Sequence, residues 1–522
     1  MGRWFLAALA LAACRTGEPR GKDAAPPAEQ QHAVVVLSSE LKGYVGPCGC
    51  SENMRGGLAR AAAQVAAART GQAPSLFLDL GDALFGSREL PEAAVPQQEA
   101  KARAIAKAFS AMHLDGRLPG PLDDARGEAL RSSLALPEVP SGQPALFHLG
   151  KLELALVSGP DGQTLAAQAA LARTRGAGFV LGAYLGPFDE ALKQVTEATG
   201  VDFVVVARSK DELSGEQNRL VRAPVPMAQM QSKGRSLLRL DLSAIGPGRF
   251  ELLRGAAEQE RDLKALDERI EQLRRQVNAP GLADELKALR KSKLEEIIAR
   301  REALAETPVA APTDKNGVAV RFIPLESNFP EDGAVKEILT GYDREVGELN
   351  LAWAKAHGTA CPAPAAGQSA YVGTARCLDC HEEAAAVWQG SKHSQALPTL
   401  EKAGKQFHLD CIGCHVTGWQ RPGGTCRIDQ TQLLASVGCE ACHGPGSVHA
   451  EDPATANILD GKAPEGCRTC HDPENSPHFD FESYLANIIG PGHGQPAPPR
   501  PDAGVRPPPP PPKSPAGKPK RK

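Results

Sequence analysis

The sequence predicts an α/β sandwich, then a charged helical hairpin, then a small, mostly helical and loop-rich C-terminal domain. Between residues 32 and 255, short apolar runs alternate with Ala-rich helical stretches, which is typical of a mostly buried sheet covered by helices. Between 256 and 306 the composition becomes charged, and leucines recur three and four residues apart. Between 371 and 493 aliphatic runs are scarce, and nine of the 13 cysteines follow residue 370.

The N-terminus predicts export. Arg3 precedes an apolar run over residues 4–13, which is too short to span a bilayer and fits a secretory signal peptide at residues 1–13. The run ends in Leu-Ala-Ala-Cys14, which resembles the lipobox of bacterial lipoproteins. The resemblance implies cleavage before Cys14 and lipidation of its sulfur; an ordinary signal peptide with a chance cysteine is the alternative. We therefore expect an exported, lipid-anchored protein at the periplasmic face of a bacterial inner or outer membrane.

Each element of the predicted sandwich rests on one apolar or Ala-rich run. A flexible linker, rich in Pro, Ala, Gln and charge, covers residues 14–31, and the sandwich domain covers 32–255. Its expected strands are 33–37, 76–80, 152–157, 179–184, 201–206, 236–242 and 249–253, and its expected helices are 58–69, 99–112 and 188–199. A strand at 318–325 and a helix at 334–356 complete the α/β part within residues 307–360.

The charged stretch 256–306 predicts two antiparallel helices with apolar seams. The first seam is Leu263, Leu266, Ile270, Leu273 and Val277; after Pro280-Gly281 the second is Leu282, Leu286, Leu289, Leu294 and Ile297. This spacing is that of a coiled coil, so the expected role is spacing or formation of a homodimer rather than catalysis. A Pro/Ala linker at 361–370 and a Pro-rich basic tail at 494–522, expected to be disordered, flank the last domain.

Eight of the C-terminal cysteines form four C-x-x-C-H motifs. They are Cys377-Leu-Asp-Cys380-His381, Cys411-Ile-Gly-Cys414-His415, Cys439-Glu-Ala-Cys442-His443 and Cys467-Arg-Thr-Cys470-His471. This is the attachment spacing of haem c: two thiols bond the haem vinyl groups, and the adjacent histidine ligates the iron from one side. A zinc site would not need that histidine, and C-x-x-C disulfides in series would not tie a fold together. Residues 371–493 are therefore predicted to be a cytochrome c domain with four covalently attached haems.

The second axial ligand of each iron is predicted to be a histidine or to be absent. All five methionines precede this domain, which argues against His/Met ligation. The distal candidates are His393, His449, His478, His493 and His408, and for each of them simple exposure to solvent is the alternative. His408 ranks last because it lies close to Cys411 of its own motif. The domain has roughly 120 residues rich in Gly, Pro and polar groups, so we expect the haems to supply its core and to lie close together.

At these residues a family resemblance is visible over residues 371 to about 480. The stretches that carry it are Tyr371-Val-Gly-x3-Cys377, Trp388-x2-Ser391-x-His393, Cys411-x2-Cys414-His415-x-Thr417-Gly418 and Cys439-Glu-Ala-Cys442-His443-Gly-Pro-Gly-x2-His449. They resemble the tetrahaem cytochrome c family associated with ammonia oxidation and its multihaem relatives. The resemblance implies stacked haem pairs, mostly with two histidine ligands, and His393 and His449 as distal ligands. Members sometimes keep one iron five-coordinate, which leaves room for redox chemistry on a small molecule.

The sandwich domain resembles the calcineurin-like metallophosphoesterase and 5'-nucleotidase domain. The resemblance rests on Leu-Asp-Leu-Gly-Asp82 at one expected strand end and on Val-Asp202 opening a strand that ends in Ala-Arg208-Ser-Lys. That fold uses several His and Asp at strand ends to hold two metal ions. Here the first strand ends in Ser-Ser-Glu40, and Ala-Arg-Ser-Lys stands where Gly-His-x-His would be expected. Only Asp82 remains as a plausible ligand, so the domain is predicted to be degenerate.

Four cysteines outside the motifs and the lipobox remain. They are Cys48, Cys50, Cys361 and Cys426. The loop from Tyr44 to Cys50, with two glycines close behind, resembles a loop in exported relatives of the sandwich domain. Because the number is even and the compartment is oxidising, we favour disulfides of unknown pairing; a metal site or an approach to a haem is the alternative for Cys48 and Cys50.

Three functions follow in order of preference. The first is a tetrahaem electron carrier between periplasmic or membrane redox partners, with the α/β domain as a docking scaffold. The second is an oxidoreductase acting on a small nitrogen or sulfur species at one open haem, and the third is a phosphoester hydrolase. The net charge of −3 argues against a general affinity for nucleic acid.

Overall fold

The computed structural model describes residues 30–47, 54–140, 142–208, 218–222, 224–277, 284–306, 314–461, 463–472, 475–476 and 479–493. The predicted signal peptide, most of the linker, the lipobox Cys14 and the Pro-rich tail lie outside the described residues. The same holds for Cys48, Cys50 and the distal candidate His478. Among the residues that are described, none of the helices combines the length and the apolar character needed to cross a membrane.

Two six-stranded sheets form the N-terminal part. The first has the order β11-β12-β10-β1-β2-β3, and the second has the order β4-β5-β6-β7-β9-β8. The strands of the first are β1 (Gln31–Ser38), β2 (Ser75–Asp79), β3 (Gly116–Arg117), β10 (Ser236–Ala244), β11 (Glu251–Leu252) and β12 (Gly317–Pro324). Those of the second are β4 (Ala145–Leu149), β5 (Leu152–Gly159), β6 (Phe179–Leu185), β7 (Phe203–Ala207), β8 (Arg219–Val221) and β9 (Met227–Gln229). In the second sheet β5, β6, β7 and β9 run parallel, and β4 and β8 add antiparallel edges.

The two sheets pack face to face and confirm the predicted α/β sandwich. Val35 and Leu37 of β1 share one buried core with Leu154 and Leu156 of β5. The alternate residues of β1 point the other way, into a second core beneath the helices. Because both faces of β1 are buried, its sequence is a continuous apolar run rather than an alternation of apolar and polar residues.

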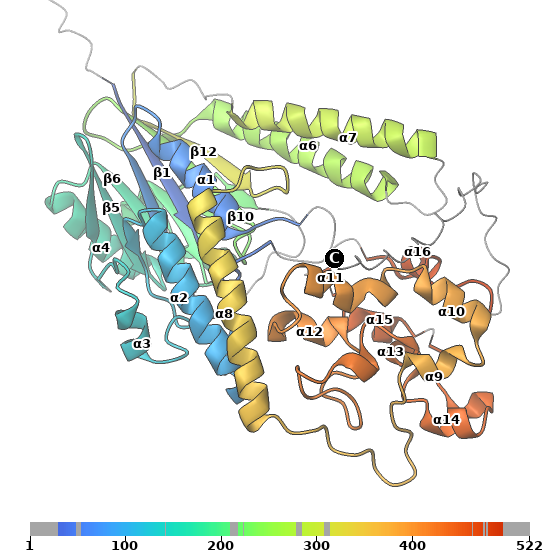
Figure 1. Ribbon diagram of the computed structural model, residues 1–522. Helices are drawn as coiled ribbons and strands as arrows, with labels where there is room; N and C mark the ends of the chain where they lie inside the picture. The colour runs from blue at the N-terminus through green and yellow to red at the C-terminus, as the bar shows by residue number, and fades with distance from the viewer. Residues whose placement is uncertain are drawn as a thin grey trace, which may run out of the picture.

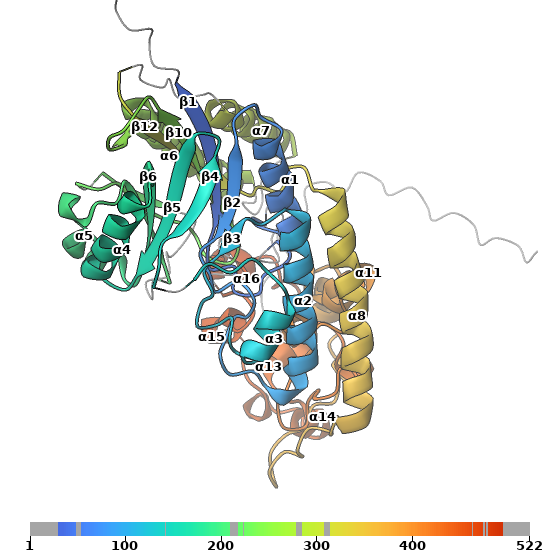
Figure 2. The same cartoon turned by 90° about the vertical axis from the view of Figure 1, so that its left-hand side faces the viewer.

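Helices cover the outer faces of both sheets. The first sheet is covered by α1 (Leu58–Arg69), α2 (Val95–Ala111) and α8 (Gly333–His357), and the second by α4 (Gly162–Thr174) and α5 (Phe188–Gln194). Figure 2 shows the sheets between these two groups of helices. The helix predicted over 188–199 ends at Gln194, because Val195 adopts an extended backbone, and a short 3-10 turn at Glu197–Thr199 follows. The short helix α3 (Glu128–Ser133) and a 3-10 turn at Glu92–Ala94 complete this part.

The charged stretch forms the predicted pair of helices, α6 (Arg254–Val277) and α7 (Asp284–Glu306). Ile270 and Leu273 of α6 pack against Leu294 and Ile297 of α7. Arg274 of α6 also donates to Glu326, which follows β12, so the hairpin is tied to the end of the first sheet.

The C-terminal region is a group of short helices beside α8 (Figure 1). They are α9 (Thr374–Leu378), α10 (Glu382–Gln389), α11 (Ala396–Lys402), α12 (Leu409–His415), α13 (Cys439–His443), α14 (Ser447–Glu451), α15 (Pro464–Arg468) and α16 (Phe481–Leu485). Short 3-10 turns lie at His393–Gln395, Gln432–Leu434 and Thr455–Asn457. A small core around Ile412 joins α11 and α12 to Ala354 of α8.

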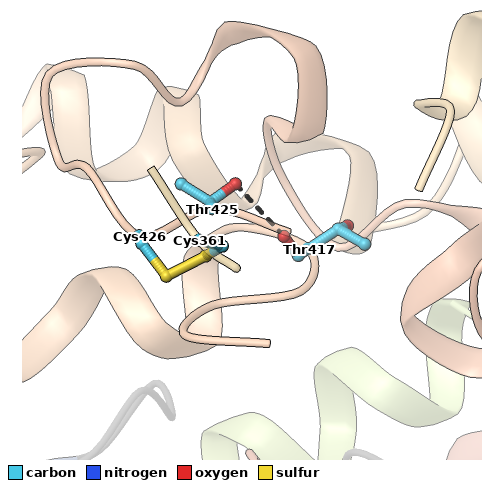
Figure 3. Close-up of a disulfide and its surroundings, with 4 residues drawn as sticks. All are labelled: Cys361, Thr417, Thr425 and Cys426. Carbon is cyan, nitrogen blue, oxygen red and sulfur yellow. Dashed lines mark hydrogen bonds between the residues drawn. A yellow bond between two sulfur atoms is a disulfide. The ribbon is translucent and has the colours of Figure 1, made fainter. Parts of the chain in front are cut away.

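A disulfide joins Cys361, which follows α8, to Cys426 in this region (Figure 3). The bond closes a loop over a sequence separation of 65 residues. Beside it, the Thr425 hydroxyl donates to the Thr417 carbonyl over 3.4 Å. The predicted linker at 361–370 is therefore fastened at its first residue.

Candidate haem sites

Each of the four motifs lies on a helical turn. In the first and fourth motifs the backbone N–H of the histidine donates to the carbonyl of the first cysteine, with His381 to Cys377 at 3.1 Å and His471 to Cys467 at 2.8 Å. The second motif forms the end of α12, and the third forms α13. In a helical turn the positions i, i+3 and i+4 share one face. Two thiols and one imidazole of each motif therefore lie on one side, as attachment of a single haem requires.

The cysteines of different motifs lie next to one another. The Cys377 thiol is hydrogen-bonded to Cys439, which lowers the pKa of Cys439 to about 7. The Cys414 thiol is hydrogen-bonded to Cys470, which lowers the pKa of Cys470 to about 6. Motif 1 is thus adjacent to motif 3, and motif 2 is adjacent to motif 4.

A third contact between motifs connects the pair 1 and 3 to the pair 2 and 4. Burial raises the pKa of Cys442, in motif 3, to about 11, and the nearby thiols of Cys467 and Cys470, in motif 4, act in the same direction. Motifs 3 and 4 are therefore also neighbours. By these contacts the motifs follow one another in the order 1, 3, 4, 2.

Two histidine pairs have the spacing of axial ligands. The rings of His381 and His449 have centroids 6.1 Å apart and planes 20° apart. The rings of His393 and His471 have centroids 6.2 Å apart and planes 46° apart. An imidazole nitrogen binds a metal ion such as zinc at about 2.0–2.1 Å, so two imidazoles on opposite sides of one ion have ring centres about 6 Å apart. Both pairs have the ring separation that a shared haem iron would require.

Hydrogen bonds fix the orientation of the motif histidines. The Nδ1 atom of His415 lies 2.6 Å from the Ala396 carbonyl, and that of His443 lies 2.9 Å from the Leu459 carbonyl. The Nδ1 atom of His471 lies 3.0 Å from the Ser476 hydroxyl. A ligand histidine commonly donates Nδ1–H in this way, which leaves Nε2 for the metal. Sequence reasoning missed the two carbonyl partners, because a backbone carbonyl leaves no signal in the identity of its residue.

Burial favours the neutral form of two of these imidazoles, which is the form that binds a metal. It lowers the pKa of His393. It also lowers the pKa of His471, where the neighbouring His393 acts in the same direction. Both members of this pair are thus suited to ligation.

The ring of His408, the last of the distal candidates, lies against α8. The side chain is buried, its ring lies 5.8 Å from that of Tyr342, and Nε2 lies 3.3 Å from the Asp343 carbonyl. In this structure Nε2 of His408 therefore faces α8, and His408 is a contact between the two parts of the chain; its role as a distal ligand stays a prediction. His493 is half-buried in the turn after α16, where its backbone N–H donates to the Gly490 carbonyl.

The strand ends of the sandwich do not fit a pair of metal ions. The Glu40 carboxylate accepts from the Arg208 N–H at 2.6 Å and pairs with Lys42 at 3.4 Å. Asp82 accepts from the Leu122 N–H at 2.8 Å. Cationic side chains thus stand beside the carboxylates, and burial raises the pKa of both Glu40 and Asp82. Within the described residues, no group of three or more His, Cys, Asp or Glu side chains is placed to hold a metal ion.

Comparison with known proteins gives different relatives for the two parts. Solved structures similar to this chain include the 5'-nucleotidase precursor of Thermus thermophilus, with a TM-score of 0.37 and 14% identity over 77% of this chain and 73% of that chain. The NAD nucleotidase of Haemophilus influenzae has a TM-score of 0.34 and 12% identity, over 42% of this chain and 55% of that chain. At these TM-scores nothing about the chemistry of the sandwich follows.

The C-terminal relatives are cytochromes. Residues 376–444, which contain the first three motifs, match the family model "Cytochrome c554 and c-prime". Cytochrome c-554 of Nitrosomonas europaea is 33% identical over 96 residues, which are 16% of this chain. The chain spans 41% of the length of that relative. In cytochromes c the haem is bound covalently through such cysteines. The C-terminal segment, with its four C-x-x-C-H turns and paired imidazoles, is thus similar to the cytochrome c554 and c-prime family over residues 376–444.

Proposed function

We propose that this protein is an exported tetrahaem c-type cytochrome that passes electrons between redox partners. The observation that carries the proposal is the pairing of His381 with His449 and of His393 with His471 at the spacing of axial ligands. These pairs join residues far apart in the sequence, and each contains one motif histidine. Haem c held at these positions supplies reversible one-electron chemistry at iron.

The contacts between the four motifs support an order in which electrons pass from haem to haem. The contacts between the motif thiols, in the order 1, 3, 4, 2, support the same order for the haems. We propose that electrons follow this order and that His381 and His471 have His449 and His393 as their distal partners. For His415 and His443 the remaining candidates are His478 and His493.

The cellular context belongs to the same proposal. A signal peptide over residues 1–13 and a lipid on Cys14 would hold the protein at the periplasmic face of a membrane, where cytochromes or membrane oxidoreductases are its partners. A homodimer through the charged hairpin would use the outer side of α7, where Leu286 is 40% and Leu289 67% exposed.

The test is production of the full chain in an export strain with haem-ligation machinery. We expect a mass increase of four haems and a c-type absorption spectrum that changes on reduction. A colourless product, or one that carries zinc, would overturn the proposal.

A haem oxidoreductase acting on a small nitrogen or sulfur species is the second candidate. It is favoured by the place of His408, the distal candidate nearest motif 2 in the sequence, which is turned toward Asp343. Only His478 and His493 then remain for His415 and His443, so one iron would have an open position if either of the two does not bind. A shift of its spectrum on addition of nitrite, hydroxylamine or sulfite, followed by turnover, would support this candidate.

A further inference from the structure

The four residues that precede Cys411 are held by two helices of the α/β part. These residues, 407–410, include the first two residues of α12, the helix that carries the second haem motif. Gln97 and Lys101 of α2, and Asp343 and Asn350 of α8, supply the contacts. Figure 1 shows α2 and α8 side by side, with the C-terminal helices next to α8.

Gln97 is the centre of this network. Its side chain is fully buried, and its Oε1 atom accepts from the Leu409 N–H at 2.9 Å and from the Asn350 amide at 2.6 Å. The Asn350 amide donates a second time, to the Phe407 carbonyl at 2.7 Å. Leu409 is the first residue of α12, so Gln97 satisfies one of the N–H groups that a helix leaves free at its start. The start of the haem-binding helix is thus capped by a residue 312 positions away.

An ion pair holds the next residue. Lys101 lies one helical turn after Gln97, and its Nζ atom is 2.6 Å from Oδ2 of Asp410. The Lys101 side chain is 9% exposed. Its aliphatic stem is therefore packed against neighbouring side chains. Its charged end lies beside Asp410, the residue directly before Cys411, which is the first cysteine of motif 2.

Apolar packing completes the contact. Ile412, inside motif 2, is fully buried in a cluster with Ala354 of α8, and Cys411 packs against the same cluster. Water is therefore kept away from this side of the motif.

We propose that Gln97 and Lys101 are positioning residues for motif 2: the α/β part sets the place of Cys411 to His415 and thereby the reduction potential of the haem attached there. This inference rests on the proposed function. By the order 1, 3, 4, 2 this haem stands at one end of the relay, so the α/β part would control one terminus of the electron path. Burial and a nearby positive charge both disfavour the oxidised, more positive iron, and both raise the potential.

The first test is Gln97→Leu in the full-length holoprotein. The variant keeps the side-chain bulk but leaves the Leu409 N–H without its acceptor and the Asn350 amide with only the Phe407 carbonyl. We expect one of the four midpoint potentials to move to a more negative value, together with a change in one of the low-temperature spin-resonance signals. The matched control is Gln168→Leu, because Gln168 of α4 is also buried and also makes two hydrogen bonds, both to Ser158, under the other sheet. The control should lose stability and keep all four potentials.

The second test uses charge and does not disturb the buried amides, so it remains available if Gln97→Leu fails to mature. Lys101→Met keeps the aliphatic stem and leaves the Asp410 carboxylate unpaired, which should also move one potential to a more negative value. Arg103→Met, which breaks the exposed Arg103–Glu345 pair between the same two helices, should leave every potential unchanged.

The outcomes separate this inference from the proposed function. If the protein carries no haem, the proposed function fails. If it carries four haems and neither Gln97→Leu nor Lys101→Met moves a potential, or if the controls move one equally, only the positioning role is overturned.

Discussion

At the scale of single residues, the structure gives the candidate distal histidines different surroundings. The ring centroid of His449 lies 6.1 Å from that of His381, and its Nδ1 atom lies 3.1 Å from the Ala454 carbonyl. His408 is just as close to a motif in sequence, yet its ring lies against Tyr342 and Asp343 of α8. His449 and His408 therefore differ in the residues that their rings contact.

His449→Ala should therefore convert one iron from low to high spin. The thioether bonds and His381 would keep the haem in place, and the sixth position would be empty or filled by water. Low-temperature spin resonance should show one new high-spin component, which added imidazole should remove. His148→Ala, at an exposed histidine in β4, is the control and should show none. A wild-type spectrum for His449→Ala would exclude this residue as a ligand.

Asp79 gives a prediction about pH. The side chain is fully buried, and burial, partly offset by Arg117, raises its pKa from 3.8 to about 6. Between about pH 4 and pH 6 the folded protein then holds a proton that the unfolded chain has lost, so the free energy of unfolding falls as pH rises through this window. The loss amounts to roughly 3 kcal/mol for a shift of this size.

Asp79→Asn should remove that slope, because the amide does not titrate, and its single oxygen can still accept from the Gly81 N–H while its NH2 group donates to the Ser38 hydroxyl. Denaturant unfolding of the α/β part at pH 4.5 and pH 6.5 measures it. Asp189→Asn, at a side chain that is 70% exposed, should behave like the wild type. An unchanged slope in Asp79→Asn would assign the pH dependence to other groups.

At the scale of elements, the sequence predicts long, buried segments and misses short ones. The runs at 33–37 and 179–184 became β1 and β6, because a strand buried on both faces is apolar throughout. The two-residue strand β3 and the three-residue strands β8 and β9 were missed, since so few residues carry no period. The helix α4 was also missed, although Asp161 caps it through the Thr164 N–H.

The candidate haem sites, too, could be predicted from the sequence only in part. Covalent spacing identified the motifs, because C-x-x-C-H is local. The pairing of motifs could not be predicted, since the contact between Cys377 and Cys439 joins elements far apart in the chain. The same is true of Gln97, whose role exists only once α2 lies against α12.

The disulfide is an element-scale constraint that can be removed. Cys361→Ser with Cys426→Ser should lower the stability of the C-terminal region by up to about 4 kcal/mol, the loop-closure value for a separation of 65 residues. The haem attachments already restrain the same loop, so the observed loss should be smaller than this limit. Thermal unfolding followed by haem absorbance measures it. Adding a reductant of disulfides should destabilise the wild type and leave the double variant unchanged.

At the scale of the whole molecule, two parts are stabilised in different ways. The sandwich has three large apolar cores, one between the sheets and one beneath each layer of helices. The C-terminal region has one small core, and it lies around α11 and α12, where α8 contributes Ala354. The helices α9, α13 and α15 have few buried apolar side chains of their own. Their stability should therefore depend on haem, while α12 is held by the α/β part.

The full chain produced without haem-ligation machinery should show which helices depend on haem and which do not. Amide hydrogen exchange should stay slow in both sheets and in α12, because Gln97, Asn350 and Lys101 do not need haem to hold residues 407–410. Exchange in α9, α13 and α15 should become fast, because the groups that fill the space between them are missing. The holoprotein is the reference, and Gln97→Leu without haem should release α12 as well. Equal protection of α13 with and without haem would mean that the region has a protein core sufficient for folding. The haems would then bind to a structure that is already folded, and they would not form its core.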